Sequence, residues 1–266
     1  MFYALAEGLI SIGDRRYVHE LADIETLNRR ALAGELEVTA VSIHAYAHLA
    51  DRYALLPHGA SIGDRYGPCL VSRRPAPADP RAGTRGLRVG VPGKLTTAFL
   101  TARLFQPDFE AVVIPFDQIE DAAIAGDVDL GLLIHEGQLT FRTRGLHLWA
   151  DLGEWWFGET GLPLPLGGNV VRRDLGDRLI RDISRDLKAS IVYGLAHRDE
   201  ALTHALQYAR GLDRAAADRF VGMYVNEFTV DYGDRGRRGV AELLARAAKA
   251  GIIPRPISVS FVEDDR

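Results

Sequence analysis

A histidine directly follows an apolar run in the stretch GLLIHEGQLT, residues 131 to 140. A neutral imidazole can accept a proton near pH 7, so His135 is a candidate general base. The alternative is a histidine that only hydrogen-bonds a neighbouring carbonyl at the end of a strand. The position favours the catalytic role, but the sequence identifies no partner side chain for it.

A second candidate is VPGKLTTA, residues 91 to 98, which resembles a phosphate-binding loop. That motif requires Ser or Thr directly after the lysine and an earlier glycine, but Leu95 and Arg88 occupy those places, so nucleotide binding is rejected. The hydroxyls of Thr96 and Thr97 remain at the start of a helix, where unpaired N–H groups and the dipole favour a small carboxylate. The alternative is that Thr96 simply caps the helix.

Two weaker candidates involve rings. His44 and His48 lie four residues apart in HAYAH, as in zinc peptidases, but the adjacent glutamate and the further ligand are not evident. We therefore expect a histidine pair on a helix surface and no metal. Trp155 and Trp156 could line a wall for a ring-shaped ligand, but core or hinge packing is the commoner role of such a pair.

The composition limits the class of protein. The 266 residues carry a net charge of −4, so no overall field draws the chain to nucleic acid or to an anionic membrane. Cys69 is the only cysteine, which excludes an internal disulfide. The first residues lack the basic region of a secretory signal, and no apolar run reaches the roughly 20 residues of a membrane helix. We expect a cytoplasmic globular protein.

The predicted elements that position these residues form one helix–glycine–strand pattern, which occurs twice in the sequence. Residues 23–42 and 116–135 each begin with an aspartate suited to capping a helix and continue with helix formers. Each then reaches a glycine that can end the helix in the left-handed conformation, followed by a strand. The residues concerned are the caps Asp23 and Asp117, the glycines Gly34 and Gly126, and the strand ends Ser42 and His135.

Around the second copy, the order strand, helix, strand, helix, strand is typical of a covered parallel sheet. Its further elements are strands at 87–93 and 111–116 and a helix at 96–105. Around the first copy we expect a helix at 2–10 and a strand at 17–22. Because ligands bind outside the carboxyl ends of parallel strands, Ser42, Gly93 and His135 should converge on one cleft.

The chain is therefore expected to have an α/β, two-lobed, periplasmic-binding-protein-like (type II) fold, each lobe a mostly parallel sheet flanked by helices. Lobe 1 would comprise residues 1–74 and 170–266 and lobe 2 residues 86–165. Crossings are expected near 72–86 and 164–172, where Pro, Gly and Arg accumulate. Four helices are expected after residue 176, and the first should bury one apolar stripe: Leu179, Ile180, Ile183, Leu187, Ile191 and Leu195.

Five stretches together closely resemble the 1,4-dihydroxy-6-naphthoate synthases of the futalosine route to menaquinone: VPGKLTTA, GLLIHEGQLTF, DLGEWW, TGLPLPLGG and YVNEF (224–228). The resemblance covers nearly the whole chain. It implies a lyase that converts cyclic dehypoxanthinyl futalosine to 1,4-dihydroxy-6-naphthoate and releases a small sugar-derived fragment. It also implies a small carboxylate substrate, no metal and no organic cofactor. A homodimer is kept as one candidate assembly.

The same resemblance assigns roles to residues. The catalytic histidine falls on His135, and the substrate contacts fall on Ala40, Val41 and Ser42 and on Thr97 and Ala98, beside the physically inferred Thr96. Relatives can carry a longer polar side chain at position 40, so only a backbone contact is expected from Ala40.

Two other functions are weighed against the lyase. Another enzyme of the same fold and pathway, such as a chorismate dehydratase, is disfavoured by the position of His135. A plain solute-binding protein would need no base and usually carries an export signal. The resemblance also predicts a strand and a polar loop ahead of residue 2, so we expect this chain to be amino-terminally truncated, less stable and weakly active.

Overall fold

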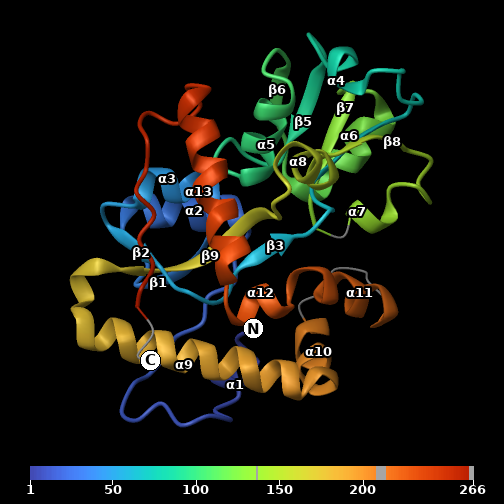
Figure 1. Ribbon diagram of the computed structural model, residues 1–266. Coiled ribbons are helices and arrows are strands. Elements are labelled where there is room, and N and C mark those ends of the chain that lie inside the picture. The colour runs from blue at the N-terminus through green and yellow to red at the C-terminus, as the bar shows by residue number, and fades with distance from the viewer. Residues whose placement is uncertain (136, 208–213, 264–266) are drawn as a thin grey trace.

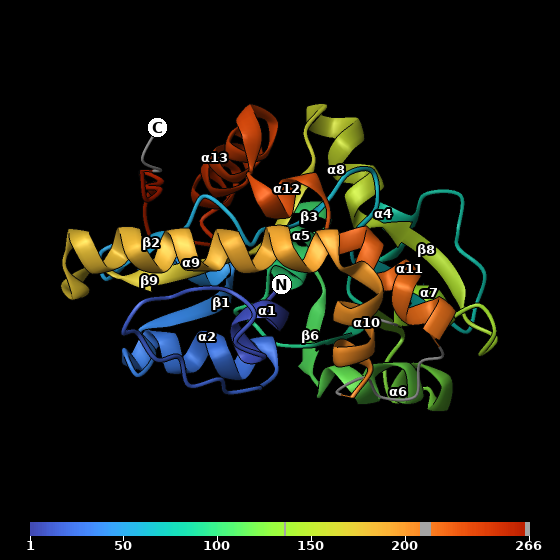
Figure 2. The ribbon, with the colours of Figure 1, turned by 90° about the horizontal axis from the view of Figure 1, so that it is seen from below.

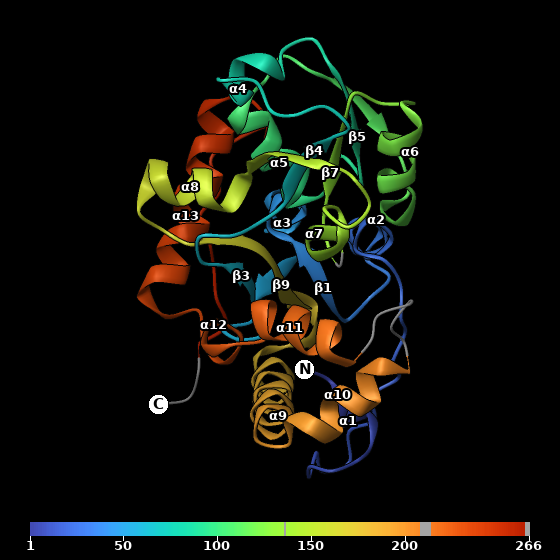
Figure 3. The ribbon, with the colours of Figure 1, turned by 90° about the vertical axis from the view of Figure 1, so that its right-hand side faces the viewer.

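A computed structural model describes residues 1–135, 137–207 and 214–263. The chain forms two α/β lobes, each built on one sheet, with a group of carboxyl-terminal helices beside the first lobe (Figure 1). This is the predicted two-lobed, periplasmic-binding-protein-like architecture. The amino-terminal residues and the long helix that follows the last strand lie together at one end of the molecule (Figure 3).

The first sheet is organised around β9 (Leu164–Arg172), which pairs with three other strands. All three pairings are antiparallel, so the expectation of a mostly parallel first sheet was wrong. The reason is that β9 returns from the second lobe and runs against the strands that precede that lobe. Its partners are β1 (Val38–Ser42), β2 (Tyr53–Leu55) and β3 (Ser61–Gly63).

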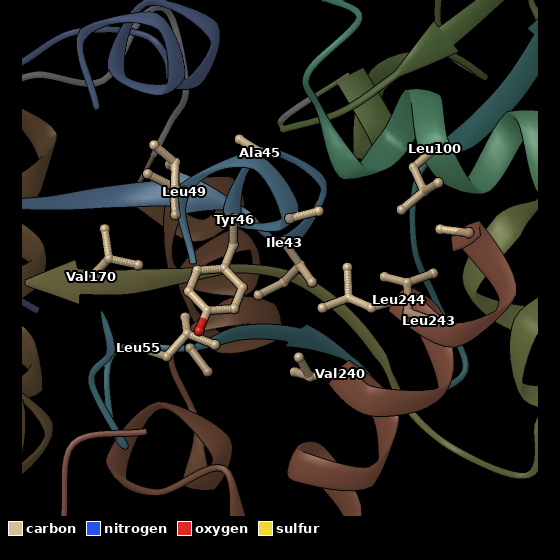
Figure 4. Packing of buried hydrophobic residues seen from close by; sticks show 14 of the residues in the cluster. Ile43, Ala45, Tyr46, Leu49, Leu55, Leu100, Val170, Val240, Leu243 and Leu244 are labelled. Atoms are coloured by element: carbon tan, nitrogen blue, oxygen red, sulfur yellow. The ribbon is translucent and has the colours of Figure 1, made fainter. Parts of the chain in front are cut away.

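Helices cover both faces of this sheet (Figure 2). Val170 of β9 belongs to the apolar cluster that includes residues of α3 (Ile43–Leu49) and α13 (Gly233–Lys249), and Figure 4 shows this packing around Tyr46 and Leu244. Val171, whose side chain points the other way, belongs to the cluster that includes residues of α1 (Tyr3–Ala6) and α9 (Asp177–Ala196).

The predicted apolar stripe of α9 is mostly confirmed. Ile180, Ile183, Leu187 and Ile191 are buried against the sheet, and Leu195 packs at the edge of the same cluster. Leu179 is 38% exposed, because it lies one residue, and therefore about 100° of helix rotation, away from Ile180.

The second sheet has the order β6-β5-β7-β4-β8. Its first three strands are parallel, as predicted, whereas β4 and β8 join antiparallel. The strands are β4 (Cys69–Ser72), β5 (Arg88–Val91), β6 (Glu110–Val113), β7 (Leu130–Leu133) and β8 (His147–Asp151). The covering helices are α4 (Pro80–Gly83), α5 (Thr97–Phe105), α6 (Ile119–Ala125), α7 (Gly137–Thr140) and α8 (Leu152–Thr160).

The repeated helix–glycine–strand unit is present in both lobes. In the first, α2 (Ile24–Ala33) is capped by the Asp23 carboxylate, which accepts from the Thr26 N–H, and Gly34 ends it with φ 77°. In the second, Gly126 ends α6 with φ 87°, as predicted. Asp117 is not the cap of α6, because a short 3-10 turn at Phe116–Gln118 precedes the helix and moves its start to Ile119.

Two other predictions fail near the start of the chain. Residues 17–22 form no strand, and Val18 and Leu21 are 77% and 74% exposed. Among the described residues the outer edge of β1 stays unpaired, so this segment does not extend the first sheet. The predicted helix at 2–10 is shortened to the single turn α1, because Gly8, two residues after Ala6, adopts φ 65° and ends the helical conformation.

The first passage between lobes also differs from the prediction. Because β4 pairs within the second sheet, the chain leaves the first sheet between Gly63 and Cys69, earlier than residues 72–86. Those residues instead continue from β4 into α4. The return passage ends where β9 begins, at Leu164.

After α9 the chain continues through α10 (Arg198–Leu206), α11 (Arg214–Tyr224) and α12 (Glu227–Val230). The last two of these, α11 and α12, were predicted as one helix. They are separate because Asn226 begins α12 with a capping box, in which its side chain and that of Thr229 each bond the other's backbone. No helix in the described parts of the chain is long and apolar enough to cross a membrane.

A close packing contact at the first passage gives a test of the fold. A Cβ on Gly153, in the first turn of α8, would lie 2.0 Å from the Tyr66 carbonyl oxygen and 2.5 Å from the Gly67 nitrogen. Gly153→Ala should therefore destabilise the protein by several kcal/mol, although a helical glycine replaced by alanine normally gains about 1 kcal/mol.

Gly158 in the same helix is the matched control, because a Cβ there meets nothing within 4 Å. Gly158→Ala should stabilise the protein by about 0.5–1 kcal/mol in urea-induced unfolding. Equal effects of the two substitutions would show that the close contact at Gly153 does not hold the passage in place.

Candidate active site

The hydroxyl of Thr97 joins the two lobes. Its oxygen accepts from the backbone N–H of His44, at the start of α3, at 3.2 Å. It donates to the Leu166 carbonyl of β9 at 2.5 Å. Thr97 is 2% exposed, so this contact is dry and charge or dipole interactions there are strong. The amino-terminal ends of α3 and α5 therefore meet at one point between the lobes.

Ser42 lies beside this point and is fixed by α2. Asn28 donates through its side-chain amide to the Ser42 hydroxyl at 3.1 Å and accepts from the Ser42 N–H at 2.9 Å. Both residues are buried. The preceding Ala40 and Val41 pair with Asn169 and Gly168 of β9, so the backbone of this strand end is held in register with the first sheet.

Thr96 caps α5, which confirms the structural alternative for this residue. Its hydroxyl accepts from the Phe99 N–H at 3.2 Å and donates to the Gly93 carbonyl at 2.8 Å. A direct substrate contact through this hydroxyl would have to break the cap. Ala98, in the first turn of α5, is 4% exposed and packs into the core of the second lobe.

Glu25 of α2 reaches across to the same loop of the second lobe. A Cβ on Gly93 would lie 2.4 Å from the Glu25 Oε2 atom, so only glycine allows this approach. Glu25 is 9% exposed and its Oε2 has no hydrogen-bond partner. Burial raises the pKa of this carboxyl, against the opposing effects of Arg29, at 3.5 Å, and of the Leu95 backbone. The contact between the lobes therefore includes a poorly solvated carboxyl group.

The histidine pair is not the surface pair that was predicted. His48 is exposed, but His44 is 4% exposed and its Nδ1 lies 3.3 Å from the Thr96 carbonyl oxygen. Its ring also stacks on Phe99, with 6.3 Å between centroids. Burial lowers the pKa of His44 to about 4, so the ring is neutral at pH 7. The reason for the error is that α3 is covered on its outer side by α5.

His135 follows β7 and is half-buried. Its φ is 56°, a left-handed conformation that is uncommon for a residue with a Cβ. The ring meets the Phe116 ring edge to face at a centroid distance of 4.9 Å, and the carbonyl accepts from the Gln138 N–H at 3.2 Å. Since β5 and β7 are parallel neighbours, His135 and the loop before Thr97 emerge at the same edge of the second sheet.

The tryptophan pair packs the region between the lobes, as the commoner alternative predicted. Trp156 is fully buried in the first-lobe core and donates to the Pro163 carbonyl at 3.2 Å. Trp155 contacts both lobe cores and meets Phe105 edge to face. Among the described residues, no group of three or more His, Cys, Asp or Glu could hold a metal ion.

A surface recess lies elsewhere on the first lobe, and its position argues against a catalytic role. A cavity of about 680 Å³ is lined by Gly34, Arg52, Arg172 and their neighbours. Arg172 is paired with Asp174 there, at 2.7 Å. This cavity lies at the end of β1 opposite to Ser42, and therefore away from the contact of Thr97 with the first lobe.

The structure thus brings together the Ser42 segment and Thr96–Thr97, as the sequence predicted. It adds Glu25, Asn28 and His44, which were missed. An acidic residue in a first helical turn and an asparagine inside a helix are common, so Glu25 and Asn28 gave no signal. Only tertiary contacts reveal their positions: Glu25 meets Gly93 of the second lobe, and Asn28 bonds Ser42 within the first lobe.

Two α/β lobes, each built on one sheet and joined through the contact of Thr97 with α3 and β9, define a periplasmic-binding-protein-like fold. The sequence profile of the menaquinone biosynthesis family matches residues 1–249, and the chain belongs to this family.

Two relatives support that assignment over 90% or more of their length. The 1,4-dihydroxy-6-naphthoate synthase of Thermus thermophilus is 41% identical over 262 residues, covering 97% of this chain and 94% of the relative. The synthase of the same name from Streptomyces coelicolor is 39% identical, covering 96% and 90%.

Solved structures agree on the fold. A crystal structure of a protein from Archaeoglobus fulgidus has a TM-score of 0.90 and 43% identity, covering 95% of this chain and 93% of that one. The alkanesulfonate-binding protein of Xanthomonas axonopodis pv. citri, bound to MOPS, has a TM-score of 0.63 at 14% identity, with coverage of 89% and 83%. This second likeness concerns the fold alone.

The buried neutral His44 predicts a pH dependence of stability. Its pKa is about 4 when folded and near 6.5 when unfolded, so the unfolded chain binds the additional proton between these values. The stability that rests on neutral His44 is complete above pH 6.5 and is lost as the pH falls toward 4. Relative to His44→Gln, the wild type should lose up to about 3 kcal/mol over this range.

Urea unfolding of both proteins at several pH values measures this difference. Asp151, whose pKa burial raises to about 6, has the opposite pH dependence, but it is present in both proteins and cancels in the comparison. Parallel stability profiles for the two proteins would contradict a neutral buried His44.

Proposed function

We propose that this protein is a 1,4-dihydroxy-6-naphthoate synthase, a lyase that converts cyclic dehypoxanthinyl futalosine to 1,4-dihydroxy-6-naphthoate. The full-length similarity to two synthases of that name carries the proposal. The position of His135 at the same edge of the second sheet as the loop before Thr97 supports it. No metal or organic cofactor takes part in the proposed reaction.

In this mechanism His135 is the general base. It removes a proton from the substrate, and the electron pair released allows a carbon–carbon bond to break and the small sugar-derived fragment to leave. The contact of His135 with Phe116 supports this role, because an apolar neighbour shields the reacting atoms from water.

The substrate carboxylate is proposed to dock at the start of α5, where the Ala98 N–H and the helix dipole favour an anion. Ser42 and the backbone of Ala40 and Val41 would close on it from the first lobe. The Thr97 hydroxyl now bonds both His44 and Leu166, so its contribution would be to closure of the lobes around the substrate as well as to contact.

Incubation of the purified protein with cyclic dehypoxanthinyl futalosine, followed by mass spectrometry, tests the reaction. Formation of the naphthoate supports the proposal. Conversion of chorismate instead would indicate a dehydratase of the same fold, and binding without turnover of either compound would indicate a solute-binding protein. Both of those results would reject the synthase.

For the base, His135→Asn should reduce kcat by about 10²–10⁴-fold, the usual contribution of general-base catalysis, without loss of folding. Circular dichroism and steady-state kinetics measure the two effects. Normal turnover in a well-folded His135→Asn protein would remove His135 from the mechanism.

For the anion site, Thr97→Val should mainly raise KM. The buried N–H of His44 and the carbonyl of Leu166 lose their hydrogen-bond partner, which destabilises the closed state by about 1–3 kcal/mol. Thr101→Val is the matched control: Thr101 is equally buried in α5, but its hydroxyl bonds only the Thr97 carbonyl of its own helix. Equal KM values for the two variants would disprove a role for the Thr97 hydroxyl.

A further inference from the structure

Two residues from stretches that carry the family resemblance, Gln138 and Tyr224, meet in space, and the proposed reaction has not used either of them. Gln138, from the stretch that carries His135, belongs to α7 of the second lobe, and Tyr224 ends α11 in the carboxyl-terminal group of helices. The Tyr224 hydroxyl donates to the Gln138 Oε1 at 2.6 Å. Figures 1 and 3 both show α7 of the second lobe next to α11.

Gln138 is tied directly to the proposed base. Its backbone N–H donates to the His135 carbonyl at 3.2 Å. The left-handed backbone of His135 costs roughly 1–2 kcal/mol and persists only where the surroundings hold it. A single helical turn such as α7 has little stability of its own. The conformation of His135 therefore depends on what holds α7.

Tyr224 is itself firmly placed. It is 9% exposed, and its ring meets the Tyr66 ring edge to face at 5.7 Å. The Tyr66 hydroxyl donates to the Met223 carbonyl, Asn226 donates to the same carbonyl at 2.9 Å, and Thr229 donates to the Tyr224 carbonyl at 3.0 Å. Burial raises the pKa of Tyr224, so its hydroxyl remains a protonated donor at neutral and mildly alkaline pH.

We propose that Tyr224 is a positioning residue for His135, acting through Gln138: it holds α7 from the side of the carboxyl-terminal helices and so keeps the imidazole aligned only while the lobes are closed. This inference rests on the proposed role of His135 as the base. It links closure of the lobes to assembly of the catalytic site, because the hydrogen bond crosses from one lobe's side to the other.

Tyr224→Phe removes only the hydroxyl. Its kcat should fall by about tenfold, the upper range for one net hydrogen bond, while KM stays within twofold. Tyr53→Phe is the matched control, because the Tyr53 hydroxyl donates a hydrogen bond of the same length, 2.6 Å, to the Leu36 carbonyl within the first lobe. That variant should lose comparable thermal stability and keep the wild-type kcat.

A double-mutant cycle completes the test. If Tyr224 acts through Gln138, then Gln138→Leu should lower kcat by a similar factor, and the double variant should be no slower than the slower single variant. A kcat for Tyr224→Phe equal to that of Tyr53→Phe, or losses that multiply in the double variant, would overturn the proposal.

The two proposals fail separately. His135→Asn with normal turnover rejects the base whatever Tyr224 does. His135→Asn with the expected loss, combined with an unaffected Tyr224→Phe, rejects only the positioning role.

Discussion

The first lobe depends on one strand, β9, which supplies the hydrogen-bond partners of β1, β2 and β3. Removing it would leave three short strands, each without a ladder, and strands of that length are not stable alone. Its two faces also carry the two apolar clusters that attach α3 and α13 on one side and α9 on the other. Its Leu166 carbonyl, in turn, accepts the Thr97 hydroxyl and so reaches the second lobe. Sheet, core and candidate site therefore share this segment.

The contact between the lobes at Thr97 and Glu25 combines stabilising and destabilising interactions. The Thr97 hydroxyl satisfies buried groups of both α3 and β9, which favours the closed arrangement. Glu25, in contrast, loses hydration at Gly93 and leaves one oxygen without a partner. An unpaired buried oxygen opposes closure, since opening would return it to water. A two-lobed enzyme needs both contributions, because substrate must enter and product must leave at a useful rate.

The local elements could largely be predicted from the sequence, whereas their pairing could not. The cap of α2, the glycines that end α2 and α6, the strands β1, β5, β6 and β7, and the convergence of Ser42 with Thr97 all follow from short-range patterns. The central strand β9 was missed, because its proline and two glycines, with another proline directly before it, are typical of a loop. Pro165 is tolerated there because at that point β9 pairs only with β3. The burial of Glu25 and His44 arises from contacts between lobes, which no local pattern records.

The position of β9 in the chain has a consequence for biosynthesis. The second lobe, from Cys69 to Asp151, is continuous in sequence and can fold as soon as it leaves the ribosome. Strands β1, β2 and β3 are made earlier, yet their partner emerges roughly a hundred residues later, on the order of ten seconds at ordinary translation rates. During that interval the earliest part of the chain exposes unpaired strand edges. The nascent protein is therefore most prone to aggregation before its second passage between the lobes has been synthesised. The first lobe begins to be synthesised first but completes its folding last.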